Sequence, residues 1–141
     1  MTILAVLAPL FVEVALTFVL LIWMAMRRRA DVGNGTVAIP RIALGEANWP
    51  PATMQVSNSF NNQFQLPVLF YVLTILVIVT RHADLLFVVL AWVFVLLRIG
   101  HAAIHTTSNI VRLRGSIYGI GAIVLIVMWV IFALRIMLAI G

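Results

Sequence analysis

The sequence predicts an all-α integral membrane protein, a single domain over residues 1–141 that folds as a bundle of four transmembrane helices. Two observations predict it. The chain is 65% hydrophobic and only 9% charged, with a mean hydropathy of +1.20, whereas a soluble domain is about half apolar and about a quarter charged. The apolar residues also fall into four runs separated by short polar segments, and each helical crossing of a bilayer needs about 20 residues.

The first predicted element is a helix over about residues 3–28. Its apolar run, from Ile3 to Met26, ends at the consecutive arginines Arg27 to Arg29. A signal peptide carries its positive charge before the apolar core and not after it, so the segment is expected to remain as the first transmembrane helix. Residues 29–53 are polar and contain several glycines and prolines, which predicts a cytoplasmic loop.

The other helices are predicted over about residues 54–80, 84–110 and 115–140. The second is strongly apolar only from Leu66 to Val79, but the polar stretch before Leu66 contains no proline or glycine. That stretch is therefore expected to form the first turns of the same helix. A tight polar turn from Arg81 to Asp84 precedes the third helix, and a short connection from Arg112 to Gly115 precedes the fourth.

The charged residues predict the orientation of the chain. All 9 basic residues are arginine, and the chain has no cysteine. The absence of cysteine excludes disulfides, thiolate metal sites and a cysteine nucleophile. The arginines lie at helix ends or along apolar helices, which favours anionic lipid head groups over nucleic acid as the partner. They gather at the first and third connections, and because basic residues favour the cytoplasmic side, both termini are expected outside the cytoplasm.

Polar side chains form two stripes along the predicted helices. On the second helix they recur at i, i+3, i+4 and i+7, within an arc of about 100°; they are Asn58, Asn61, Asn62 and Gln65. On the third helix they are Arg98, His101, His105, Asn109 and Arg112. Both stripes lie toward the cytoplasmic side and are expected to line one cleft. Arginine holds carboxylates bidentately and amides bond peptide-like groups, so the cleft suits a ligand that has both.

Each polar residue also has a simpler explanation. Asparagine and glutamine join helices through hydrogen bonds, and arginines at helix ends anchor membrane proteins. Two stripes at one depth nevertheless favour a functional cleft. His101 and His105 have the i, i+4 spacing of a metal site, but no third ligand is placed to complete it, so no metal is expected. Glu13, in the middle of the first helix, is expected to be protonated or to pair with Arg135.

The stripes combine with other features into a recognisable pattern. The first helix ends in arginines, the Asn-rich second helix leads into Pro67, and the third helix carries Arg98-x-x-His101-x-x-x-His105. Over essentially the whole chain this pattern resembles the MAPEG family, the membrane-associated proteins of eicosanoid and glutathione metabolism. The segment from Asn62 to Tyr71 is similar to the bacterial branch. The resemblance implies a homotrimer that binds glutathione between adjacent subunits near the cytoplasmic side, where an arginine stabilises the thiolate.

The chain departs from the family pattern at several positions on the second and third helices. In leukotriene-forming members, the third helix carries an arginine, two tyrosines and the catalytic arginine at the spacing of Arg98, His101, His105 and Arg112. Both tyrosine positions are histidines here. The family's second helix carries an arginine and a glutamate that hold the charged ends of glutathione. Counted back from Pro67, those positions fall on Ser57 and Phe64; counted from Asn58 instead, Asn61 stands at the glutamate position. In either alignment the arginine and the acid are missing.

Two functions are expected on these grounds. The first is a glutathione-dependent transferase or peroxidase that acts on lipophilic electrophiles from the bilayer of a bacterial inner membrane. The second is a non-catalytic scaffold or accessory subunit whose polar cleft holds lipid head groups or water. The missing arginine and glutamate favour the scaffold, whereas Arg98 and Arg112 favour the enzyme, which we place ahead by fold analogy. Arg112 is the predicted catalytic residue, and the predicted glutathione-binding residues are Arg28, Asn58, Asn61, Asn62, Gln65, Arg98, His101 and His105.

Overall fold

The computed structural model describes residues 2–45 and 48–140, with side chains as far as Leu138. Its described part is entirely helical and contains no strand. The elements are α1 (Ile3–Gly33), α2 (Ile39–Ile42), α3 (Pro51–Asn61), the 3₁₀ turn η1 (Asn62–Phe64), α4 (Leu66–Val79), α5 (Leu85–Thr106) and α6 (Val111–Ile140). The predicted loop over residues 29–53 includes Glu46 and Ala47, which lie outside the described residues.

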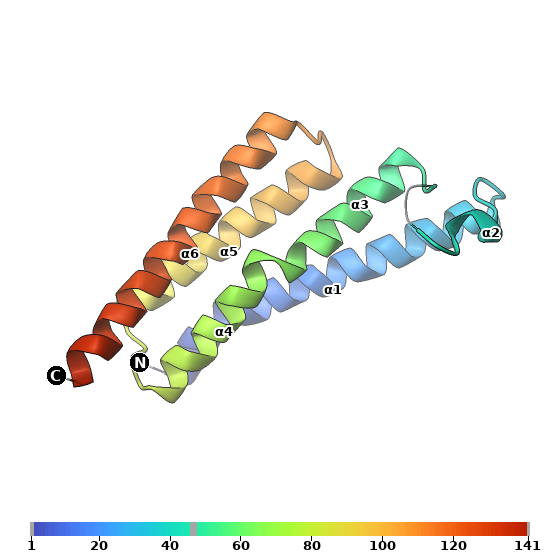
Figure 1. The fold of residues 1–141 in the computed structure, drawn as a ribbon. Helices are drawn as coiled ribbons and strands as arrows, with labels where there is room; N and C mark the ends of the chain where they lie inside the picture. Colours follow the sequence, from blue (N-terminus) through green and yellow to red (C-terminus); the bar gives the residue numbers. More distant parts are fainter. Residues whose placement is uncertain (1, 46–47, 141) are drawn as a thin grey trace.

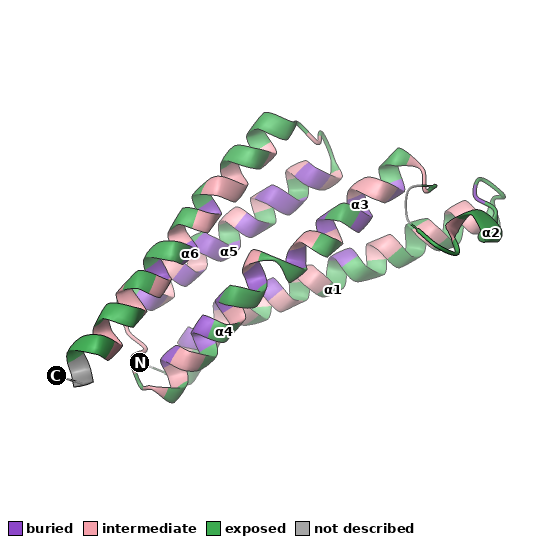
Figure 2. Ribbon diagram, in the orientation of Figure 1, coloured by how far each residue is buried: buried purple, intermediate pink, exposed green. Residues whose placement is uncertain are grey.

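Four segments are long and apolar enough to cross a membrane: Ile3–Gly33, Pro51–Val79, Leu85–Thr106 and Val111–Leu138. The predicted four membrane helices are therefore confirmed. Large apolar side chains such as Phe18, Ile75, Leu96, Ile123 and Ile126 are exposed on them, and exposed faces run along the length of each helix in Figure 2. Such surfaces suit contact with lipid, because lipid tails are as apolar as these side chains.

The helices pack as two pairs, α1 with the α3–α4 segment and α5 with α6, and the two pairs meet where α1 packs against α5 (Figure 1). α1 packs against α3 and α5, and α6 packs along α5 and contacts α4. The apolar core lies between α4, α5 and α6, where Phe70, Phe94 and Leu125 are among the buried residues. The start of α1 and the end of α6 lie at the same end of the bundle, as an even number of crossings requires.

The second membrane segment is broken, whereas the sequence predicted one continuous helix. α3 ends at Asn61, a 3₁₀ turn follows, and α4 starts again at Leu66. The break has a local cause in Pro67, which has no N–H to bond the preceding turn and disfavours helical geometry at the residue before it. At Gln65 the backbone takes φ −102° and ψ −107°, which is outside the helical region.

The third membrane helix ends earlier than predicted. α5 stops at Thr106 and not near residue 110, and the chain reverses through Asn109, whose φ is 49°. Asparagine tolerates this left-handed conformation better than most residues, and its N–H bonds the carbonyl oxygen of Ile104 at 2.8 Å. α6 then starts at Val111. Arg112 therefore stands in the first turn of α6, and the predicted five-residue stripe does not continue along one helix.

Candidate functional site

A buried ion pair lies at the middle of the bundle. Glu13 of α1 and Arg98 of α5 are 0% and 1% exposed, and Glu13 Oε1 lies 3.6 Å from Arg98 Nε. Glu13 follows Ile3, the start of α1, by ten residues, which is about 15 Å along a helix and about half the hydrocarbon thickness of a bilayer. Both charges therefore lie at the depth where an unpaired charge is most costly.

The predicted pairing of Glu13 with Arg135 is wrong. Arg135 donates instead to Asp84 Oδ2 at 2.6 Å and ties α6 to the turn before α5. Periodicity locates Glu13 on a helix face, but depth decides its partner: Arg98 lies in the middle of α5, whereas Arg135 lies near the end of α6 where the chain termini are. The Arg135 hydrogen bond holds the pKa of Asp84 below its usual range.

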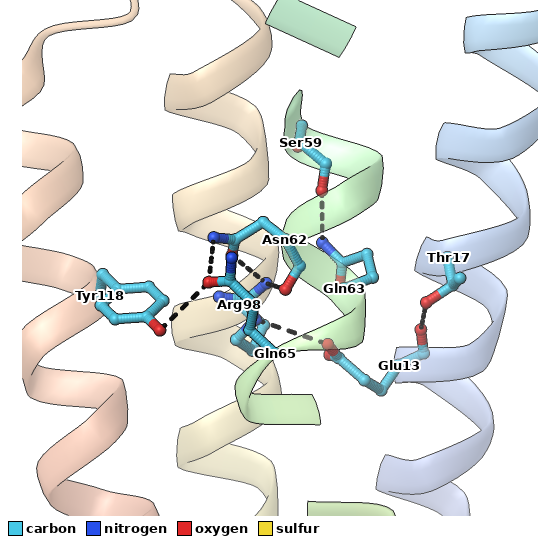
Figure 3. Close-up of polar contacts among 8 residues, drawn as sticks. All are labelled: Glu13, Thr17, Ser59, Asn62, Gln63, Gln65, Arg98 and Tyr118. Atoms are coloured by element: carbon cyan, nitrogen blue, oxygen red, sulfur yellow. Dashed lines mark hydrogen bonds and ion pairs between the residues drawn. The ribbon is translucent and has the colours of Figure 1, made fainter. Parts of the chain in front are cut away.

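Arg98 begins a chain of hydrogen bonds that crosses the bundle (Figure 3). Its Nη2 donates to Asn62 Oδ1 at 2.7 Å and to the Asn62 carbonyl oxygen at 3.3 Å. Asn62 Nδ2 donates to Gln65 Oε1 at 3.0 Å, and the Tyr118 hydroxyl of α6 donates to the same oxygen at 3.3 Å. One polar network thus connects α1, α5, the break before α4, and α6.

Two buried histidines extend this network toward the α5–α6 turn. The rings of His101 and His105 lie 5.6 Å apart between centroids, and His101 lies 5.6 Å from the ring of Tyr118. Arg114, in the first turn of α6, donates to Asn109 Oδ1 in the turn between α5 and α6. The Nδ1 atoms of both histidines are buried without a hydrogen-bond partner among the described residues.

The rest of the second-helix stripe faces outward. Asn58, Asn61 and Gln65 are exposed, and Asn62 is half-buried against Arg98. The structure therefore brings Asn62 and Gln65 to the network and leaves Asn58 and Asn61 on the outer surface of the chain. The described part of the chain has no group of three or more His, Cys, Asp and Glu side chains placed to hold a metal.

Two of the three arginines predicted for the site, Arg28 and Arg112, lie apart from the buried network. Arg28 donates to Ser57 Oγ at 3.0 Å, and its guanidinium lies 5.0 Å from the ring centroid of Trp49, so it ties α1 to α3 and to the segment before α3. Arg112 is exposed, and its side chain makes no polar contact with the described residues. Of the two arginines in the first turn of α6, Arg114 is thus the one bonded within the described part of the chain, through Asn109.

Sequence reasoning missed the contribution of Tyr118 and the role of Gln63 and Ser59. Gln63 Nε2 donates to the Ser59 carbonyl oxygen at 3.3 Å, and both residues are buried beside the network (Figure 3). Tyr118 is a tyrosine in the first turns of an apolar helix, and tyrosines are common at membrane interfaces, so its type alone did not distinguish it. Its i+4 relation to Arg114 was the available signal.

An apolar groove adjoins the polar network. It has a volume of about 560 Å³ and lies between α4 and α6, where Leu66, Leu69, Leu125 and Trp129 are among its lining residues. Leu66, which lines the groove, directly follows Gln65 of the polar network in the sequence.

Comparison with known proteins identifies one family. The model of the MAPEG family matches residues 6–134, which is nearly the whole chain. No curated protein matches the chain, and no solved structure matches it.

Proposed function

Because this chain belongs to the MAPEG family, we propose that it is a membrane enzyme that binds glutathione and transfers its sulfur to lipophilic electrophiles or uses it to reduce lipid hydroperoxides. The observation that carries the proposal is the polar network inside membrane-spanning helices. Polar and ionisable side chains at bilayer depth are costly and mark functional sites by default. Here they come from every membrane segment and meet at one place.

The chemistry of the network suits an anionic tripeptide. The network holds the cationic Arg98 and the buried imidazoles of His101 and His105, and the amide of Gln65 is exposed at its edge. The bound glutathione would supply a thiol nucleophile. The residues of this chain would bind its peptide groups, orient its sulfur and exclude bulk water from the buried part of the site.

Arg112 is the residue proposed to favour the thiolate. An arginine stays charged at any working pH and stabilises an anion without titrating. Arg112 stands in the first turn of α6, where the positive end of the helix dipole also favours negative charge. Arg114 is already bonded to Asn109, whereas the exposed Arg112 side chain is available to a ligand.

The site is proposed to be completed by a homotrimer. Asn58 and Asn61 are exposed on the single chain, and amides that face hydrocarbon are unfavourable unless a neighbouring helix covers them. A second copy of the chain on this face would cover them and close the ligand site between subunits. Arg28 then remains a proposed binding residue at the entrance, held in place by Ser57.

The lipophilic substrate is proposed to enter from the bilayer. The apolar groove between α4 and α6 is lined by apolar side chains, among them Leu69 and Leu66, the residue after Gln65. Its volume of about 560 Å³ is within the range of ligand pockets, about 300–1,000 Å³. The site is proposed to open to the cytoplasm of a bacterium, on the arginine-rich side of the inner membrane.

A titration tests the proposal directly. The protein purified in mild detergent is titrated with glutathione by calorimetry, and turnover of a generic aryl halide is measured in parallel. Heat of binding with turnover supports the enzyme. A specific observation favours the alternative, a scaffold or accessory subunit: Arg98 is already engaged by Glu13 and Asn62. Absence of both binding and turnover would leave the scaffold as the better reading.

A further inference from the structure

We infer that the buried Glu13–Arg98 pair orients the side-chain amide of Gln65, so that Gln65 Nε2 binds a carboxylate or peptide carbonyl oxygen of the ligand. Glu13 thereby becomes a positioning residue, although it lies too deep in the bundle to touch the ligand. The inference rests on the proposed glutathione function and deepens it, because it assigns a donor to one point of the site.

The first step is the fixed location of the Arg98 guanidinium. Arg98 is 1% exposed, and the carboxylate of Glu13 is the acidic group described beside it. The pair lies at mid-bilayer depth, where no water competes for either charge. The 3.6 Å ion pair with Glu13 on α1 thus favours the position of the α5 guanidinium beside the end of α3, although the two side chains do not hydrogen-bond.

The second step is the direction of the hydrogen bonds, from donor to acceptor, between Arg98, Asn62 and Gln65. An arginine side chain has only donors, so Asn62 must present its oxygen to Arg98, and the 2.7 Å contact joins Nη2 to Oδ1. The amide nitrogen of Asn62 then points the other way and donates to Gln65 Oε1 at 3.0 Å. A reversed Asn62 would set its own NH₂ group against the guanidinium.

The third step fixes Gln65. Its Oε1 accepts from Asn62 and also from the Tyr118 hydroxyl at 3.3 Å. Two donors on one oxygen settle which end of the amide faces the protein, and Nε2 faces away from it. Because Gln65 is exposed at this point, its Nε2 meets a ligand as a donor, and a donor selects an acceptor oxygen.

The break in the second membrane segment supports the same assignment. The carbonyl oxygen of Asn62 also accepts from Arg98 Nη2 at 3.3 Å, so the guanidinium binds both the backbone and the side chain where α3 ends. A cation at the C-terminal end of a helix is favourable. Arg98 thus stabilises the 3₁₀ turn that carries Gln65 out of the helix line.

A double-mutant cycle in the full-length protein tests the inference, with glutathione as the probe and calorimetry in mild detergent as the measurement. Glu13→Gln and Gln65→Ala are each expected to weaken binding by about tenfold, the effect of losing one well-placed hydrogen bond. The double variant is expected to lose about tenfold as well, because both changes remove the same contact. Loss of about a hundredfold would show independent effects and would overturn the inference.

A matched control separates positioning from general stability. Thr74 of α4 is fully buried and bonds only the Phe70 carbonyl oxygen in its own helix, so Thr74→Val is expected to lower the melting temperature and leave glutathione affinity unchanged. In the kinetics, Glu13→Gln is expected to raise KM for glutathione and leave kcat at saturation nearly unchanged. A lowered kcat with an unchanged KM would indicate a merely structural role and would contradict the inference.

A neutral pair keeps the test decisive if Glu13→Gln does not fold. Glu13→Gln combined with Arg98→Met removes both buried charges, and it is expected to fold and to bind about tenfold more weakly. Adding Gln65→Ala to it is expected to change nothing further. Binding as tight as wild type in the neutral pair would refute the positioning role alone. Absence of glutathione binding by the wild type would refute the proposed function, and the inference with it.

Discussion

Arg98 and Glu13 form an ion pair between α5 and α1 with an Nε–Oε1 distance of 3.6 Å and almost no exposure of either side chain. Because the pair is buried, removal of one partner leaves the other charge without compensation. Arg98→Met is therefore expected to lower the free energy of unfolding by about 3–5 kcal/mol. Unfolding in mild detergent, followed by circular dichroism, measures the change.

The neutral double variant provides the control for this stability prediction. Glu13→Gln with Arg98→Met is expected to recover most of the loss, because replacing both partners of a buried pair is often close to neutral. If the double variant is as unstable as Arg98→Met alone, the loss comes from packing or from Asn62 and not from the buried charge.

Arg112→Ala is expected to remove most of the glutathione-dependent activity and to leave the fold unchanged, because the side chain is exposed and packs against nothing in the core. Each pKa unit of lost thiolate stabilisation corresponds to about 1.4 kcal/mol, or about tenfold in the thiolate-to-thiol ratio. Turnover and the ultraviolet absorbance of the bound thiolate measure the effect. Arg112→Lys is expected to be intermediate, since lysine lacks the planar fork.

Arg114→Ala is the matched control for Arg112→Ala, because Arg114 lies two residues further along α6. It removes the guanidinium that bonds Asn109. We expect a smaller loss of turnover than for Arg112→Ala. The opposite ranking would move the thiolate-stabilising role from Arg112 to Arg114.

The Asp84–Arg135 pair predicts a weak pH dependence of stability. The pKa of Asp84 lies below its usual value, chiefly because Arg135 donates a hydrogen bond to it. A lowered folded-state pKa adds stability above the unfolded value of about 3.9, and this is lost as pH falls through the folded value. Arg135→Gln is expected to cost about 0.2–1 kcal/mol at neutral pH, since the pair is partly exposed. The difference between the two proteins should vanish at the acidic end of a pH series; a constant difference would mean another cause.

The oligomeric state is testable without any ligand. The outward-facing amides of Asn58 and Asn61 lead us to expect a three-chain species by native mass spectrometry in mild detergent. Replacing both by leucine is expected to weaken that species if the amides hydrogen-bond across the interface. A monomer at all protein concentrations would rule out the intersubunit site.

The membrane orientation is the last prediction. Arg27, Arg28 and Arg29 lie within the C-terminal part of α1, which ends at Gly33, and Arg112 and Arg114 lie in the first turn of α6, at the end of the bundle opposite the chain termini. Because arginines favour the cytoplasmic side, a reporter that is active only in the cytoplasm should give no signal when fused after Gly141. The same reporter inserted after Gly35 should give one, and a reversed pattern would contradict the topology.

The four membrane helices were predictable because the length and hydropathy of each segment alone determine whether it can span a bilayer. The face of Arg98, His101 and His105 was predictable too, since periodicity fixes which residues of a helix point together. All three are buried as one set. Helix ends were less predictable: no glycine or proline marks the end of α5 at Thr106, and the turn depends on Asn109 taking a left-handed conformation.

Partners across helices were the least predictable feature. Glu13 had more than one arginine available, and the choice of Arg98 depends on relative depth, which no single-helix pattern contains. The break at Gln65 is similar: Pro67 permits it, but Arg98 stabilises it from another helix through Asn62. Both features follow from tertiary contacts and become visible only when the helices are placed side by side.

The length of α1 has a consequence for how water-soluble molecules arrive. α1 has 31 residues, about 46 Å at 1.5 Å per residue, which exceeds a hydrocarbon thickness of about 30 Å. Trp23 of α1 lies level with Thr106 at the end of α5, so the rest of α1 rises above the α5–α6 turn. The start of α3 rises with it, joined through Asp31 and Thr53. Together they extend beyond the α5–α6 turn on one side of the site, so we expect solutes from the aqueous phase to arrive from the other side, over that turn.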